Sequence, residues 1–135
     1  MKKGRLLNSE LSYAISRIGH TAHLTVCDAG LPIPRDAPRI DLAVEPGYPH
    51  LLRVLGAILS EMMVEEIVLA QEIREKNPAM LRGILETFAA HDLSPKVTMV
   101  PHETFKELTW ESEAIVRTGE CTPYANVILK SGVVF

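Results

Sequence analysis

The sequence predicts an α/β fold: a three-layer single domain over residues 1–135, with a mostly parallel central sheet and helices on both faces. Segments of strand character alternate along the chain with segments of helical periodicity, which is the pattern of parallel strands joined by helical crossovers. A length of 135 residues suits one domain. Aromatic residues make up only 5% of the chain although 47% is hydrophobic, so we expect an aliphatic core.

The first part of the chain predicts one helix and two short strands. Asn8 or Ser9 can cap a helix, and Gly19 suits a left-handed stop after it. Residues 23–27 are rich in β-forming side chains, and residues 40–44 form a second short strand before a Pro-Gly turn. The first helix is indicated by apolar side chains at helical spacing: Leu11, Ile15 and Ile18.

The rest of the chain alternates regularly between helix and strand. Residues 50–63 place their apolar side chains on one helical face, and residues 66–70 contain an apolar run that suits a strand buried on both sides. Pro78 is a favourable first-turn residue for the next helix. The remaining expected elements are helices over 78–90 and 102–108 and strands over 96–100, 114–118, 126–130 and 133–135.

Charge and hydropathy argue against several classes of protein. A net charge of −3 disfavours nucleic-acid binding, because such proteins usually carry a basic face. No apolar run approaches the roughly 18 residues of a membrane span, and the basic start does not continue as a signal peptide. Cys27 and Cys121 stand far apart, which favours free thiols and a cytoplasmic protein. The mean hydropathy of +0.10 is slightly apolar for a small chain and indicates surface buried in an oligomer.

Polar side chains lie at the carboxyl ends of the expected strands, where open α/β sheets bind their ligands. They are a carboxylate, an imidazole, a phenol and an amide, from Asp28, His102, Tyr124 and Asn126. His20 stands just beyond the first helix. Such a set suits a small polyhydroxylated ligand, because each hydroxyl both donates and accepts a hydrogen bond.

Each of these residues also has a purely structural interpretation. His20 could cap a helix C-terminus, where the helix dipole favours a cation. His102 suits the first turn of the short helix, Asp28 suits a turn in which it bonds its own backbone, and Asn126 lies beside a turn. There is no glycine-rich phosphate loop, no nucleophile elbow and no third ligand near His20 and His23, so we expect no cofactor and no metal. Acid–base catalysis or simple binding is what remains.

Several segments together support a family resemblance: Gly19-His20-Thr21, Asp28-Ala29-Gly30-Leu31-Pro32-Ile33-Pro34, His102-Glu103, Arg117-Thr118-Gly119-Glu120 and Pro123-Tyr124-Ala125-Asn126. From end to end the chain resembles the family of D-ribose pyranases and L-fucose mutarotases. The Gly-Leu-Pro-Ile-Pro continuation resembles the ribose branch of that family.

The resemblance implies an isomerase that interconverts the pyranose and furanose forms of D-ribose for ribose utilisation, without a cofactor. It implies that His20 is the acid that protonates the sugar and that Asp28, His102, Tyr124, Ala125 and Asn126 bind it. It also implies a homodecamer of two pentameric rings, in which a neighbouring subunit completes each site. A non-catalytic sugar-binding accessory protein of a transport system is the alternative, and His20 separates the two because binding needs no proton donor.

Overall fold

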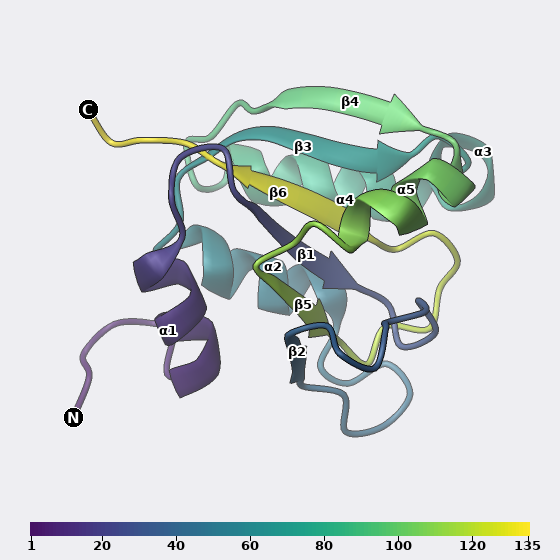
Figure 1. The fold of residues 1–135 in the computed structure, drawn as a ribbon. Coiled ribbons are helices and arrows are strands. Elements are labelled where there is room, and N and C mark those ends of the chain that lie inside the picture. The colour runs from purple at the N-terminus through teal and green to yellow at the C-terminus, as the bar shows by residue number, and fades with distance from the viewer.

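A computed structural model describes residues 1–135 and contains one six-stranded mixed sheet in the order β2-β5-β1-β6-β3-β4 (Figure 1). Only β6 runs antiparallel to its neighbours, β1 and β3, while the other pairs are parallel. The predicted α/β class with a mostly parallel sheet is confirmed. The strands are β1 (His23–Cys27), β2 (Arg39–Asp41), β3 (Val64–Ala70), β4 (Lys96–Val100), β5 (Ala114–Arg117) and β6 (Val127–Ser131).

Five helices accompany the sheet, and two of them begin where the sequence indicates, α1 after its cap Asn8 and α4 at Pro78. Asn8 Oδ1 accepts a hydrogen bond from the backbone N–H of Leu11 at 2.9 Å, and Pro78 stands in the first turn of α4. Such caps satisfy backbone donors that have no partner inside the helix. The helices are α1 (Ser9–Arg17), α2 (Leu51–Leu59), α3 (Ile73–Lys76), α4 (Pro78–Ala89) and α5 (His102–Thr109).

Helices cover both faces of the sheet, but unequally. Strand β1 shows the division, since Leu24 and Val26 face one side and Cys27 faces the other. The first face packs with α1, α2 and α4 into a core of 24 buried residues, whereas α5 and the segment after β1 cover a smaller cluster of six. Figure 1 shows α2 and α4 behind the sheet and α5 in front of it. No helix has both the length and the apolar character needed to cross a membrane.

Some sequence-based boundaries were wrong. The helix expected over 50–63 ends at Leu59, and the strand expected over 40–44 covers only Arg39–Asp41, so apolar periodicity continued beyond the hydrogen-bonded elements. Residues 133–135 form no strand, because β6 ends at Ser131 and the last residues have no strand beside them. The single-turn helix α3 was not predicted.

The stop after α1 also differs from the prediction. The helix ends at Ile18 in extended backbone, and the left-handed residue is Thr21, with φ of 67°, rather than Gly19. The backbone N–H of Thr21 donates to Ser131 O at 2.9 Å, so pairing with the end of β6 determines this conformation. Contact with a distant strand therefore decides where the chain turns.

Candidate active site

A cleft of about 650 Å³ lies at the carboxyl edge of the sheet. In Figure 1 the arrowheads of β1, β3 and β4 point toward this edge, and that of β6 points away. Three segments line the cleft: residues 28–32, His102, and residues 120–124. The structure thus brings Asp28, His102 and Tyr124 together, as expected from their positions after strands, in a space of the size that small-molecule sites occupy.

Asp28 and Asn126 form a reciprocal pair beside this cleft. The backbone N–H of Asp28 donates to Asn126 Oδ1, and Asn126 Nδ2 donates to Asp28 Oδ2, both at 2.9 Å. Gly30 N–H donates to Asp28 Oδ1 at 2.9 Å, so Asp28 also makes the turn that its structural interpretation describes. Asn126 is 1% exposed and does not line the cleft. Its amide therefore orients the Asp28 carboxylate.

His102 is the first residue of α5, and its ring lies between two aromatic side chains. The ring stacks on Phe105 at 6.3 Å and meets Tyr124 edge-on at 5.0 Å. Its backbone N–H donates to both carboxylate oxygens of Glu72 at 3.1 Å, and this bond is the main reason that the pKa of Glu72 lies below its usual value. His102 Nδ1 is buried without a hydrogen-bond partner. Such an atom is costly unless something binds it.

Tyr124, Ala125 and Asn126 form a tight turn before β6. Tyr124 has a left-handed backbone, with φ of 56°, and its carbonyl accepts from Asn126 N–H at 2.9 Å. Ala125 is fully buried, so its methyl group belongs to the core and not to the cleft. Among these three predicted residues, only Tyr124 lines the cleft.

Glu120 is a cleft residue that sequence reasoning missed. Its side chain is 3% exposed, and both carboxylate oxygens have partners. Oε2 lies 3.2 Å from His50 Nε2 and 3.4 Å from Leu51 N, while Oε1 accepts from Thr122 Oγ1 at 2.9 Å. The carboxyl group therefore ties the loop to the start of α2. His50 and Glu120 stand far apart in the chain, so no local pattern indicated their contact.

A close backbone approach and the side chain of Asn77 also fix the loop over residues 119–124. A Cβ on Gly119 would collide with the backbone carbonyl of Tyr48, so only glycine fits there. Asn77 Nδ2 donates to Thr122 Oγ1 at 2.9 Å and to the Pro123 carbonyl at 2.8 Å, while its Oδ1 caps α4. The wall of the cleft is thereby attached to two helices.

His20 lies at the opposite edge of the sheet from the cleft. It precedes β1 and Asp28 follows it, so the five-residue strand separates them by roughly 16 Å at about 3.3 Å per residue. Within one chain the structure therefore does not bring His20 to the other predicted site residues. Its Nε2 lies 2.9 Å from Glu65 Oε2, and the two side chains are 51% and 40% exposed. Glu65 was not singled out in the sequence.

The cysteines and the metal-ligating residues offer no alternative chemistry. Cys27 and Cys121 are both free, as expected. Burial, together with the nearby Asp28 carboxylate, raises the pKa of Cys27 to about 12, so at neutral pH this residue is a core thiol and not a nucleophile. No three His, Cys, Asp or Glu side chains converge in an arrangement that could hold a metal ion.

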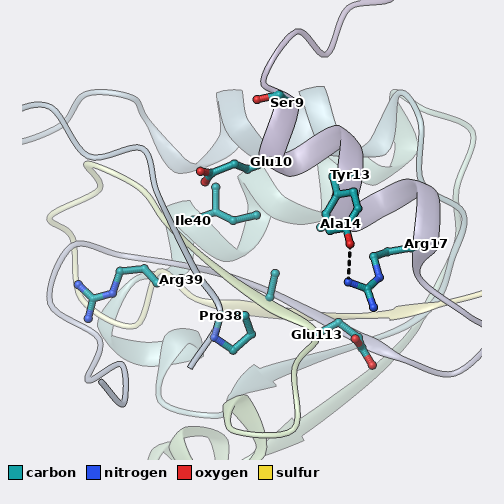
Figure 2. A pocket seen from close by; sticks show the side chains of 10 residues that line it. Ser9, Glu10, Tyr13, Ala14, Arg17, Pro38, Arg39, Ile40 and Glu113 are labelled. Atoms are coloured by element: carbon teal, nitrogen blue, oxygen red, sulfur yellow. Dashed lines mark hydrogen bonds between the residues drawn. The ribbon is translucent and has the colours of Figure 1, made fainter. Parts of the chain in front are cut away.

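A second cleft, of about 490 Å³, lies between α1 and the strands β2 and β5 (Figure 2). Tyr13 and Arg17 of α1 border it, and Arg17 Nη1 donates to the Tyr13 hydroxyl at 2.9 Å. Acidic and basic side chains both line it, and no polar atom there is buried without a partner. None of the site residues predicted from the sequence belongs to this cleft.

The whole chain is similar to proteins of one known family. The RbsD / FucU transport protein family matches residues 1–134. A D-ribose pyranase of Rhodopirellula baltica is 66% identical over 135 residues, and one of Haemophilus influenzae is 54% identical over 139, each with 100% of both chains covered. Bacillus subtilis RbsD complexed with D-ribose has a TM-score of 0.92 and 38% identity, covering 100% of both chains. The fucose mutarotase of Streptococcus pneumoniae in complex with L-fucose has a TM-score of 0.85 and 25% identity, again over 100% of both chains.

Proposed function

Because the chain belongs to the RbsD / FucU family, we propose that it is an isomerase that interconverts the pyranose and furanose forms of D-ribose. The observation that best supports this is a cleft lined by both Asp28 and His102, whose ring has a buried Nδ1 without a hydrogen-bond partner. A sugar hydroxyl can bond to both kinds of group, since it donates and accepts at once. The full-length similarity to RbsD bound to D-ribose supports the same substrate.

The reaction needs only proton transfers around the anomeric carbon. One group protonates the ring oxygen as its bond to that carbon breaks, and the anomeric hydroxyl gives its proton to a base. The open aldehyde then closes through a different hydroxyl, with the reverse transfers. Histidine can serve in both directions near neutral pH, so His20 is the proposed acid.

The carboxyl-edge residues have separate parts in holding the sugar. Asp28 accepts from sugar hydroxyls, His102 Nδ1 bonds to one of them, and Tyr124 offers a flat apolar surface. Asn126 acts by orienting Asp28, to which it is bonded at 2.9 Å. Ala125, which is buried, shapes the turn between them.

The proposal includes an oligomer in which a neighbouring subunit brings its His20 to each cleft. The position of His20 beyond the far end of β1 supports this, because one chain alone leaves the acid and the binding groups apart. We propose the homodecamer of two stacked pentameric rings, located in the cytoplasm, where both free cysteines stay reduced. Light scattering should give a mass about ten times the chain's 14.9 kDa. A monomeric mass would contradict the shared site.

Exchange NMR on D-ribose tests the activity directly. With protein present, magnetisation should pass between the pyranose and furanose signals faster than in buffer. L-Fucose serves as a second sugar in a parallel sample. If the protein binds ribose but leaves the exchange rate at that of buffer, it is a binding protein and the isomerase proposal is wrong.

A further inference from the structure

His20 and Glu65 meet beside the end of β6, at the amino edge of the sheet. The backbone N–H of Thr21 donates to Ser131 O at 2.9 Å, and Val64 pairs with the same Ser131 across the sheet. Ser131 thus positions two backbone segments, the one that follows His20 and the one that precedes Glu65. The two side chains join there through the 2.9 Å contact between Nε2 and Oε2.

Glu65 is the extra residue of a β-bulge. Val64 pairs with Ser131 and Glu66 pairs with Lys130, so two steps along β3 correspond to one step along β6. Bulges bend a strand and redirect the side chain of the extra residue, often beside functional sites. Gly132 lies against this residue, since a Cβ there would stand 3.3 Å from the Glu65 Cβ.

The residue after His20 is irregular as well. Thr21 has φ of 67°, a conformation that is unusual for a β-branched side chain and persists only where the surroundings determine it. Its hydrogen bond to Ser131 and that of Ala22 N–H to the Gly19 carbonyl, at 3.2 Å, keep the turn closed around His20. Two backbone irregularities, both anchored at Ser131, therefore orient the two side chains of one contact.

We propose that Glu65 is a positioning residue for His20, which rests on the function proposed above. When Nε2–H donates to the carboxylate, the neutral ring has its free electron pair at Nδ1, and this nitrogen faces the substrate. In ring opening, the protonated ring gives its Nδ1 proton to the ring oxygen as the C–O bond breaks, which leaves the neutral Nε2–H ring. The anomeric hydroxyl gives its proton to water, which becomes hydronium, and its oxygen becomes that of the aldehyde. In closure, the attacking hydroxyl gives its proton to Nδ1 and the aldehyde oxygen takes a proton back from hydronium, while Nε2–H stays hydrogen-bonded to Glu65 throughout.

Kinetics distinguish this role from a merely structural one. In Glu65→Ala we expect kcat for ribose exchange to fall about 10- to 100-fold with KM nearly unchanged, the usual cost of losing an orienting partner. Glu65→Gln keeps an oxygen that accepts from Nε2 and should recover part of that loss. Glu66→Gln is the matched control, because Glu66 bonds instead to Thr98 at 2.6 Å and Lys130 at 3.3 Å. Wild-type kcat in Glu65→Ala, or an equal loss in Glu66→Gln, would overturn the proposal.

A measurement without substrate separates this inference from the proposed function. The ¹⁵N chemical shifts of the His20 ring should report a single Nε2–H tautomer in the wild type and a mixture in Glu65→Ala. Identical His20 shifts in the two proteins would refute the positioning role even if exchange is catalysed. A protein with no ribose exchange, but with the expected shifts, would refute the function and leave the contact intact.

Discussion

The two edges of the sheet present their polar groups in opposite ways. At the carboxyl edge, Asp28 and Asn126 bond to each other twice, and the His102 backbone is tied to Glu72. At the amino edge, one hydrogen bond joins His20 to Glu65, and about half of each side chain remains exposed. The groups proposed to bind the sugar are thus fixed by partly buried hydrogen bonds within the chain. The proposed proton donor stands on the surface, where a neighbouring copy can cover it.

The largest expected effect is at the amino edge. His20→Ala should reduce catalysed pyranose–furanose exchange about 10²- to 10⁴-fold, which is the usual contribution of a positioned acid or base. Ribose affinity should change little, because the role of His20 is concentrated in the transition state. Exchange NMR and titration calorimetry on the same sample measure the two quantities. Full exchange activity in this variant would remove His20 from the mechanism.

Mixed assemblies test whether the two edges work together across subunits. At a low ribose concentration, pure His20→Ala oligomers should be nearly inactive, and pure Asp28→Ala oligomers should keep at most about a tenth of the wild-type activity because they bind ribose more weakly. When the two variants are refolded together, some clefts receive an intact Asp28 from one chain and an intact His20 from the next, so part of the activity should return. Native mass spectrometry confirms that mixed particles form. If the mixed particles are no more active than the average of the two pure variants, each site belongs to a single chain.

The carboxyl edge should respond in affinity more than in rate. Asp28→Ala removes an acceptor for sugar hydroxyls, and the unpaired group costs about 1–3 kcal/mol, or about tenfold or more in ribose affinity. Asn126→Ala should weaken binding similarly and also lower the free energy of unfolding by about 1–3 kcal/mol, because Asn126 is buried and both of its bonds to Asp28 would be lost. Calorimetry and urea unfolding measure these effects. Unchanged ribose affinity in both variants would make them turn residues only.

The smallest expected effect is on the stability of the fold at acidic pH. The folded-state pKa of Glu72 lies below its ordinary 4.5, mainly because the carboxylate accepts the His102 N–H. The hydrogen bond to ionised Glu72 therefore stabilises the fold above pH 4.5, and this stabilisation is lost as the pH falls through the lower folded-state pKa. Glu72→Gln should lose less stability than the wild type between neutral pH and about pH 3. Glu75→Gln, at an exposed residue of the same helical turn, is the control. If the free energy of unfolding falls equally with pH in the two variants, the Glu72 carboxylate does not provide this stabilisation.

Local chemistry explains why much of the fold was predictable. Asn8 and Pro78 act within one helical turn, so their neighbours in the sequence suffice to indicate a helix start. The strands over 23–27 and 96–100 match the prediction at both ends, since their β-forming residues are bounded by turn signals. The placement of Asp28, His102 and Tyr124 at one edge followed from the rule that parallel strands end on the same side.

The sequence by itself determined the class of fold, the helix caps and the side chains that follow each strand, because these depend on contacts within a few residues. Only the tertiary structure decided that Asn126 orients Asp28, that Glu120 ties its loop to α2, and that Thr21 rather than Gly19 turns left-handed. It also decided that a bulge at Glu65 meets His20 at the edge opposite the cleft. The partners in each of these contacts come from distant parts of the chain, and their pairing follows from how strands align across the sheet.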